Sequence, residues 1–324
     1  MKYTFVIPVK EINDYIRETI PNILEIKRDD FEIIIYPNEI NSEHWPKTKQ
    51  ISTGPGGPAM KRNLAIRDAK GEILIFVDDD AFPKNNLLEI LDQDFNDKNI
   101  IAVGGPALTP KEDNFWQKVS GAVFLSNFSG GFPERYVQVG QKRFINDWPS
   151  VNLSIRKNNF QKVKGFNSEY WPGEDTKLCI DLLKENKGKI IYDPELIVYH
   201  HRRQGLLEHL KQVGNYGIHR GFFAKKYPET SLKLKYFVPS FFLLFIILGA
   251  ISSIFSSIIL RLYILGWIIY ALSYIKIFFD IHKYEKNILI IFNTFYYIFL
   301  THIWYGTRFL QGFIFTKNLK SKYR

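Results

Sequence analysis

Short apolar runs alternate with mixed segments of helical length over the first two hundred residues of the chain. Residues 3–9 and 31–36 are apolar runs that predict strands, and residues 13–27 between them predict a helix with Asn13 or Asp14 as its N-cap. A strand, a helix and a strand at this spacing form a βαβ unit, whose two strands are parallel. The pattern therefore predicts an α/β fold with a mostly parallel sheet and helices on both faces.

Further apolar runs, most of them bounded by glycine or proline, predict the other strands. They lie at residues 71–77, 100–105, 146–155, 189–194 and 196–199. The mixed segments that predict helices lie at residues 61–69, 84–91 and 156–163. Residues 52–60 are too rich in Gly and Pro for a helix or a central strand, so they predict a loop. Residues 109–147 show no regular period and predict a long variable stretch over the sheet, suited to recognising a substrate.

The composition changes to long apolar segments near residue 237. Residues 237–260 contain no charge and residues 262–279 contain only Lys276, so two spanning helices are expected at about 237–258 and 261–279. A third block, at about 288–306, is rich in Tyr and Phe and predicts either another span or a helix in the membrane interface. Positive residues lie on both sides of this block, which favours an interfacial helix.

Residues 206–226 predict one helix, loosened by Gly214, Gly217 and Gly221, with an aromatic and basic surface. Such a helix suits either the bilayer surface or packing against a core, and the two alternatives stay open. The expected organisation is a catalytic domain over residues 1–230, including an amphipathic helix at 205–230. A membrane region with a basic tail would follow at 237–324.

The formal net charge of +10 permits binding to nucleic acid, to an anionic membrane surface or to a polyanionic substrate. Much of the excess flanks the apolar blocks, which favours a membrane surface over nucleic acid. The single cysteine, Cys179, excludes an intramolecular disulfide and favours a reducing compartment. Lys10 and Glu11 interrupt any signal-peptide-like apolar stretch, so the N-terminal domain is expected in the cytoplasm.

Three consecutive carboxylates, Asp78, Asp79 and Asp80, follow the apolar run at residues 71–77. Unpaired charges cannot be buried with that strand without a cost of several kcal/mol, so they are expected at the edge of the sheet. Clustered oxygen ligands there suit Mg²⁺ or Mn²⁺ bridging to substrate phosphates. The alternative is a solvated acidic turn without a metal.

Basic groups are expected near the same edge. Arg62 lies close to the start of a predicted helix, where a guanidinium group and free backbone N–H groups both favour phosphate. His200, His201, Arg202 and Arg203 follow the strand at residues 196–199 directly. Alternation along the strand places His200 and Arg202 on one face and His201 and Arg203 on the other. The alternative for this cluster is binding to anionic lipid head groups.

Five segments in order resemble a family 2 glycosyltransferase of the GT-A type, over roughly residues 3–230. The matching pieces are the first strand with Pro8, Lys61-Arg62-Asn63, the aspartate triplet, Asn152, and Trp171-Pro172-Gly173-Glu174-Asp175.

The resemblance implies roles for these residues. Asp175 would be the general base for an acceptor hydroxyl and Glu174 would orient or bind the acceptor, although carboxylates in a first helical turn can also be simple caps. Asn152 and Trp171 would contact the acceptor. Asp80, Asp78 and His200 would hold the metal. The nucleotide sugar would contact Pro8, Arg62, Asp78, Asp79 and Arg202, with Asn38 or Glu39 in place of the acidic residue that commonly binds the nucleobase.

The sequence therefore predicts a multi-pass protein of the cell membrane with a cytoplasmic catalytic domain. It would be an inverting glycosyltransferase that moves a sugar from a nucleotide-diphosphate donor to a lipid-linked or cell-surface glycan, with Mg²⁺ or Mn²⁺. Two alternatives are a transferase that uses a polyprenyl phosphate as acceptor and a non-catalytic membrane scaffold. The intact acidic motifs argue against the scaffold.

Overall fold

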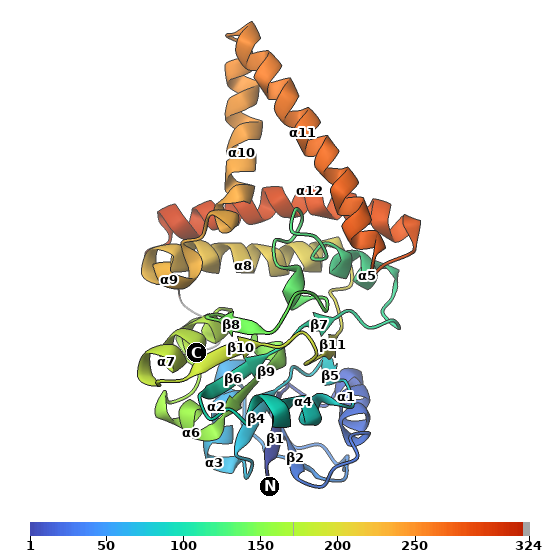
Figure 1. The fold of residues 1–324 in the computed structure, drawn as a ribbon, viewed down its shortest axis with the longest axis vertical. Helices are drawn as coiled ribbons and strands as arrows, with labels where there is room; N and C mark the ends of the chain where they lie inside the picture. Colours follow the sequence, from blue (N-terminus) through green and yellow to red (C-terminus); the bar gives the residue numbers. More distant parts are fainter. Residues whose placement is uncertain (171, 320–324) are drawn as a thin grey trace. The chain divides into compact units, whose positions relative to one another are not determined.

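The chain forms two compact units in a computed structural model that describes residues 1–170 and 172–319. The sheet unit comprises residues 1–110 and 137–201, and the helical unit comprises residues 111–136 and 202–319 (Figure 1). The helix at residues 206–226 thus groups with the apolar helices by its contacts. The expected functional boundary near residue 230 stays a prediction.

The sheet unit is built on an eight-stranded mixed sheet with the strand order β3-β2-β1-β4-β9-β6-β10-β8. Its strands are β1 (Tyr3–Pro8), β2 (Phe31–Tyr36), β3 (Thr48–Gln50), β4 (Ile73–Phe76), β6 (Ile100–Gly104), β8 (Arg143–Ile145), β9 (Leu153–Arg156) and β10 (Lys189–Tyr192). The expected parallel direction holds for most strands, but β9 and β8 run antiparallel to their neighbours. A small second sheet joins β5 (Ala81–Pro83), β11 (Val198–His200) and β7 (Ala107–Leu108).

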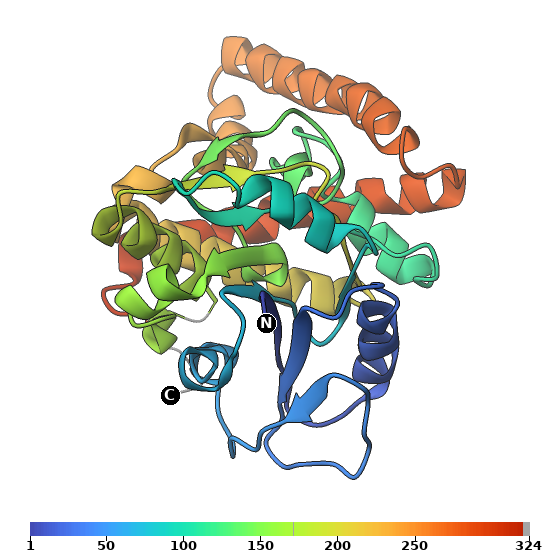
Figure 2. The same cartoon turned by 60° about the horizontal axis from the view of Figure 1, so that its bottom comes forward.

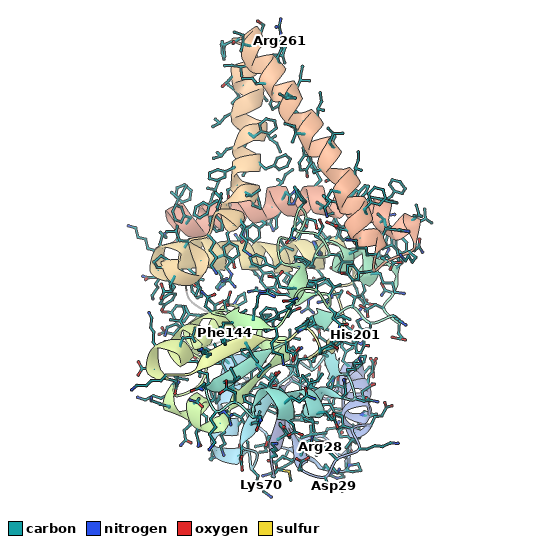
Figure 3. All side chains as sticks on the ribbon, viewed as in Figure 1. Arg28, Asp29, Lys70, Phe144, His201 and Arg261 are labelled. Carbon is teal, nitrogen blue, oxygen red and sulfur yellow. The ribbon has the colours of Figure 1, made fainter. Side chains whose placement is uncertain are left out.

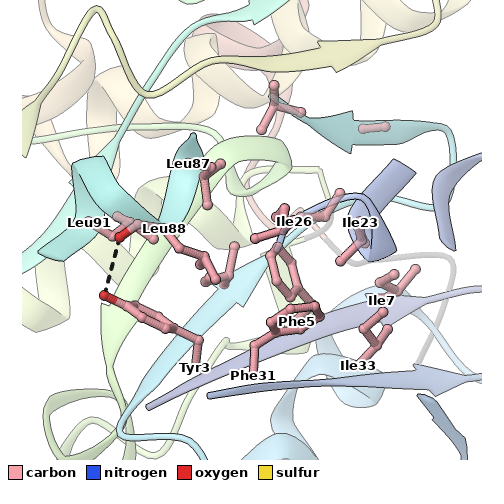
Figure 4. Packing of buried hydrophobic residues seen from close by; sticks show 14 of the residues in the cluster. Tyr3, Phe5, Ile7, Ile23, Ile26, Phe31, Ile33, Leu87, Leu88 and Leu91 are labelled. Atoms are coloured by element: carbon pink, nitrogen blue, oxygen red, sulfur yellow. Dashed lines mark hydrogen bonds between the residues drawn. The ribbon is translucent and has the colours of Figure 1, made fainter. Parts of the chain in front are cut away.

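Helices cover both faces of the large sheet, as predicted. Their hydrophobic residues fall into two clusters: α1 (Asp14–Leu24) and α4 (Leu87–Asp94) contribute to one. The other contains residues of α2 (Pro58–Asn63), α3 (Ala65–Asp68), α6 (Lys157–Lys162) and α7 (Glu174–Glu185). Side chains alternate along β1, so Phe5 and Ile7 enter the first cluster and Val6 the second. Figure 4 shows Phe5, Phe31 and Leu88 in the first cluster, where each buried side chain stabilises the fold by about 1.5–3 kcal/mol.

Several predicted boundaries shift. The helix predicted to begin at residue 61 begins at Pro58, inside the expected loop, because proline is favoured in a first helical turn. The helix predicted at residues 84–91 is α4, and the strand predicted at residues 146–155 is the shorter β9. A short 3₁₀ turn at Ser150–Asn152 occupies the middle of that predicted strand.

The helical unit contains α5 (Phe115–Ala122), α8 (Leu206–Lys226), α9 (Pro228–Ser231), α10 (Leu234–Ser253), α11 (Ser257–His282) and α12 (Ile288–Leu310). Three of its helical segments are long and apolar enough to cross a membrane: Leu234–Ser253, Ser257–His282 and Ile288–Phe315. They suggest a membrane-associated protein. Helices α10 and α11 form a hairpin with Arg261 near its tip, whereas α12 lies alongside α8 (Figures 1 and 3).

The glycines of α8 bring it close to α12 and do not interrupt the helix. A Cβ atom on Gly217 would lie 2.8 Å from the Tyr305 carbonyl oxygen, and one on Gly221 would lie 2.1 Å from that of Phe309. Small residues at such positions let two backbones approach closely. The expectation that these glycines loosen the helix is therefore wrong, and packing against a core accounts for this face of α8.

Part of the stretch expected over the sheet, residues 111–136, belongs to the helical unit instead. It contains the unpredicted helix α5, whose N-terminus is closed by a capping box between Asn114 and Gln117. In this unit His209 lies between the hydroxyl oxygens of Ser120 and Thr301, at 2.8 Å from each. Burial lowers the pKa of His209 to about 4, so this histidine is a neutral link between helices.

Candidate active site at the carboxyl end of the sheet

The chain segments that follow β1, β2 and β4 meet at one edge of the sheet. The strands are parallel, and their registers place Pro8 opposite Tyr36 and Val6 opposite Phe76. Lys61 joins two of these segments, because its buried ammonium group donates to the Val9 carbonyl and to Asn38 Oδ1, each at 2.6 Å. Burial lowers the pKa of Lys61.

Asp78, Asp80 and His200 form a group that suits a divalent cation. Each offers one ligand atom, and these atoms lie within 4.8 Å of one another. The pairing of β11 with β5 sets His200 opposite Ala81, and His200 Nε2 lies 3.1 Å from Asp80 Oδ1. Two carboxylates and an imidazole match the ligand preferences of Mn²⁺ and, through the carboxylates, of Mg²⁺. The structure thus brings together the three side chains predicted as metal ligands.

Asp79 makes a different contact from the other two aspartates. Its Oδ2 accepts a hydrogen bond from Asn13 Nδ2 at 2.8 Å, and Asn13 Oδ1 caps α1 by accepting from the Ile16 amide at 2.9 Å. Burial, reinforced by the neighbouring Asp80, raises the pKa of Asp79 to about 6. Asp79 therefore ties the triplet to α1, and its predicted contact with the nucleotide sugar stays a prediction.

Arg62 connects the two acidic motifs of the site. Its side chain is 4% exposed and forms ion pairs with Asp78 and with Glu174, the latter at 3.4 Å. The guanidinium group also lies over the ring of Phe166, 5.4 Å from its centroid. Since Asp78 follows β4 and Glu174 begins α7, Arg62 holds segments together that are distant in the sequence.

Glu174 and Asp175 occupy the first turn of α7. Gly173 precedes them with a φ of 135°, a conformation that residues with a side chain rarely adopt. Glu174 is buried, and burial followed by the charge of Asp175 raises its pKa to about 7, although Arg62 acts in the opposite direction. Asp175 is half-buried, and its Oδ1 accepts from the Thr176 amide at 2.7 Å. This is a local contact between a side chain and the backbone within the first turn of α7.

The other predicted site residues have varied surroundings. Asn152 is buried and donates to the carbonyl oxygens of Pro106 at 3.0 Å and Leu196 at 2.6 Å, which is a structural contact. Pro8 is buried at the end of β1, and Glu39 is exposed. Trp171 lies outside the described residues.

The basic cluster after β11 divides. His200 lies in the metal-ligand group. The His201 Nε2 atom lies 3.0 Å from Glu18 Oε2, and its ring centroid lies 4.9 Å from that of Tyr15 on α1. Arg202 is the first residue of the segment 202–319 of the helical unit. Within that unit, its backbone amide donates a hydrogen bond to Asp113 Oδ2 at 3.1 Å. Its guanidinium group lies 5.0 Å from the centroid of the Tyr136 ring. Contact between Arg202 and a diphosphate stays a prediction.

Sequence reasoning missed the roles of two residues that support this edge. Lys61 belongs to the recognised Lys-Arg-Asn segment, but only Arg62 was assigned a role. Asn63 Nδ2 donates a hydrogen bond to the Phe166 carbonyl at 2.8 Å, and Asn63 Oδ1 accepts one from the Phe166 amide at 2.7 Å. The available signal was a lysine and an asparagine on either side of Arg62, shortly after a Gly/Pro-rich stretch.

Comparisons with known proteins agree with this fold. Residues 4–163 match the model of the family described as glycosyl transferase family 2. Glycosyltransferase GlyG of Streptococcus pneumoniae is 26% identical over 222 residues, which cover 62% of this chain and 70% of GlyG. The poly(ribitol-phosphate) beta-N-acetylglucosaminyltransferase TarS of Staphylococcus aureus is 25% identical over 126 residues, or 32% of this chain, but the match spans only 21% of TarS.

One solved structure resembles the chain over nearly its whole length. It is the mannosyltransferase PcManGT from Pyrobaculum calidifontis in complex with GDP-Man and Mn²⁺. The TM-score is 0.56 at 14% sequence identity, over 98% of this chain and 88% of that one. At this identity the likeness shows a shared fold.

Proposed function

Because this chain is a glycosyltransferase with a family 2 domain over residues 4–163, we propose that it is a membrane-anchored inverting enzyme that uses a nucleotide-diphosphate sugar. The observation that carries the proposal is the convergence of two acidic motifs on Arg62 beside the group of Asp78, Asp80 and His200. These charges lie at the carboxyl end of parallel strands, where open α/β sheets bind ligands.

The residues that follow β1, β2 and β4 would bind the donor. Asp78, Asp80 and His200 would hold Mg²⁺ or Mn²⁺, which supplies positive charge for the diphosphate leaving group when it is bound. Arg62 keeps Asp78 in place. The nucleotide would contact Pro8, and either Asn38 or Glu39 would contact the nucleobase. PcManGT was solved with GDP-Man and Mn²⁺, which supports this donor class for the shared fold.

Asp175 is the proposed general base. Asp175 lies in the first turn of α7, and its neighbour in the sequence, Glu174, forms an ion pair with Arg62, which supports this role. Removing the proton from an acceptor hydroxyl makes the oxygen nucleophilic, and a single displacement at the anomeric carbon inverts its configuration. Glu174 forms an ion pair with Arg62, so we assign it to binding or orienting the acceptor and not to proton removal.

The acceptor is proposed to be a lipid-linked or cell-surface glycan. TarS acts on poly(ribitol-phosphate) according to its name, and the three apolar helices would hold this chain at a membrane. We propose that α10 and α11 span the bilayer, that α12 lies in the interface beside α8, and that the sheet unit is cytoplasmic. A helix packed along the charged helix α8 fits an interfacial position better than a span.

A donor screen tests the proposal. The purified full chain in detergent is incubated with uridine, guanosine and other nucleotide-diphosphate sugars with Mn²⁺ or Mg²⁺, and release of the nucleoside diphosphate is measured. One donor should be hydrolysed only when the metal is present. Asp80→Asn should abolish this hydrolysis, whereas Asp29→Asn, at a side chain that is 99% exposed, should not. Failure to hydrolyse any donor, with the protein folded, would contradict the proposal.

A further inference from the structure

A pocket lies beside the small sheet, where β5 pairs with β11 and packs against α1 (Figure 1). Its volume is about 350 Å³, and all of its lining residues belong to the sheet unit. Phe82 of β5 lies directly opposite Tyr199 of β11, and their ring centroids are 5.4 Å apart. Both residues are half-buried, so the two rings form an aromatic floor that a ligand can reach.

The pocket and the metal-ligand group lie on opposite faces of the small sheet. Ala81 is paired with His200, and Phe82 is paired with Tyr199. Side chains of successive residues in a strand point to opposite faces, so the two aromatic rings face away from His200. His200 belongs to the metal-ligand group, whereas neither ring has a part in the proposed transfer. The pocket is therefore separate from the site that would bind the donor.

Polar groups without a negative charge surround the aromatic floor. The remaining lining residues are Asn22, Pro83, Lys84, Asn85 and Asn86. Each of the three amides can donate and accept hydrogen bonds, and Lys84 adds the only charge among these described lining residues. The side chains of Lys84 and Asn86 and the Tyr199 hydroxyl make no hydrogen bond to any residue that the structure describes. These groups are thus available to a ligand.

This combination of groups fits a sugar ring better than other small ligands. One face of a pyranose ring carries C–H bonds that stack on an aromatic ring, and its hydroxyl groups need both donors and acceptors at the edge. A phosphate or diphosphate would instead need several cationic donors, and the pocket has one. A purely apolar ligand would separate the amides from water without giving them a partner. The volume lies within the range of about 300–1,000 Å³ that is usual for small-molecule sites.

We infer that Phe82 and Tyr199 form the floor of a second site, which binds a neutral pyranose unit of a glycan chain. The two rings contact one face of the sugar, and the amide groups around them bind its hydroxyl groups. The inference goes beyond the proposed function, because this binding needs neither donor nor metal nor transfer. If the acceptor is a glycan, the site holds a sugar unit other than the one that reacts.

Direct binding of trisaccharides tests the inference. The full chain is placed in a zwitterionic detergent without a sugar head group, with EDTA and without donor. It is titrated with neutral trisaccharides of glucose, mannose, galactose and N-acetylglucosamine, and saturation-transfer NMR reports binding. At least one trisaccharide should bind, and the protons on one face of a pyranose ring should receive the most saturation.

Substitutions at the floor then separate stacking from folding. Phe82→Leu and Tyr199→Leu keep an apolar side chain but remove the flat ring, and each should weaken binding about tenfold. Phe82→Tyr, which keeps a ring, should retain binding. Phe144→Leu is the matched control, because Phe144 is a 63% exposed ring elsewhere in the sheet unit, and its loss should leave the affinity unchanged.

Three results would overturn the inference. The first is that no trisaccharide binds to the wild-type protein, and the second is equal affinity in wild type, Phe82→Leu and Tyr199→Leu. The third is displacement of the trisaccharide by uridine or guanosine monophosphate, which would make the pocket a nucleotide site. Donor hydrolysis by the wild-type protein is measured separately. If a donor is hydrolysed while no trisaccharide binds, the inference fails and the proposed function stands.

Discussion

The two ends of the large sheet carry charged networks of opposite character. At the amino end of β1, Asp92 pairs with Lys2 and Arg28, and Arg28 also pairs with Asp30. At the carboxyl end, Arg62 is shared between Asp78 and Glu174, and further carboxylates lie close by. Figure 3 shows Arg28 and His201 at these opposite ends of the sheet unit. The first network balances its charges, whereas the second has more acids than bases.

The pKa values of the carboxyl groups differ between the two ends of the sheet in the same sense as the charge balance. Burial raises the pKa of Asp92, but hydrogen bonds from Arg28, Lys2 and Tyr3 outweigh it and lower the value to about 2. Burial and then a neighbouring carboxylate raise the pKa of Asp79 to about 6 and that of Glu174 to about 7, and Arg62 offsets only part of the shift of Glu174. The amino end is therefore built for stability. The carboxyl end tolerates an unfavourable charge balance, which is typical of a functional site.

The largest effect is expected at the proposed base. Asp175→Asn should lower the rate of sugar transfer to a hydroxyl acceptor by about 10²–10⁴-fold, because the amide cannot take the proton. Donor affinity, measured by calorimetry, should stay within about twofold of wild type. Full transfer by the variant would instead indicate a phosphate acceptor, which needs no base.

Removing the positive charge of Arg62 should increase the excess of negative charge at the carboxyl end of the sheet. Arg62→Met leaves Asp78 and Glu174 without their shared cation, and we expect the free energy of unfolding to fall by about 3–5 kcal/mol at pH 8. Denaturant unfolding in EDTA measures this change. Arg67→Met is the control, since Arg67 is 72% exposed and its removal should cost less than about 1 kcal/mol. Equal effects of the two substitutions would refute a central role for Arg62.

Removing the charge of Glu174 should stabilise the metal-free protein. Between its usual pKa of 4.5 and its folded pKa of about 7, the unfolded chain has lost this proton while the folded chain keeps it. Stability therefore falls as the pH rises through this window. Glu174→Gln should remove that part of the pH dependence and raise the free energy of unfolding at pH 8 by about 1–3 kcal/mol. A variant that is less stable than wild type at pH 8 would contradict the assigned charge imbalance.

At the amino end of the sheet, removing the charge of Asp92 should lower the free energy of unfolding, and the change should be smaller than that for Glu174. The pKa of Asp92 is depressed, so its contribution is present above about pH 4 and is lost as the pH falls towards 2. Asp92→Asn should lower the free energy of unfolding by about 1 kcal/mol at pH 7, because the pairs are partly exposed. The difference between the variant and wild type should vanish near pH 2. A constant difference over this range would mean that Asp92 acts by packing.

Local sequence patterns predicted the elements better than their arrangement. The apolar run at residues 31–36 and the helix at residues 206–226 match β2 and α8, because length and periodicity specify such elements directly. The antiparallel direction of β9 between β4 and β6 depends on tertiary pairing and leaves no local signal. Helix α5 was missed because eight residues give too few turns for a clear period.

The candidate site was predictable as a set of residues but not as a set of contacts. The triplet and the pair Glu174-Asp175 stand out as carboxylates after a strand and before a helix. No spacing could show that Arg62 joins Asp78 to Glu174, since these partners lie 16 and 112 residues away. The motif alone predicts that Asn152 contacts the acceptor, and this stays a prediction. Its hydrogen bonds to Pro106 and Leu196 could not be predicted, because they depend on how three loops meet.

We expect the acidic excess at the carboxyl end of the sheet to hold a divalent cation. Titration of the purified full chain with Mn²⁺, followed by electron paramagnetic resonance of the free ion, measures this most directly. We predict a single site of Mn²⁺ that Mg²⁺ displaces, that Asp80→Asn abolishes and that Asp29→Asn retains. Binding of Mn²⁺ to Asp80→Asn with the affinity and stoichiometry of the wild type would rule out a metal site at this group.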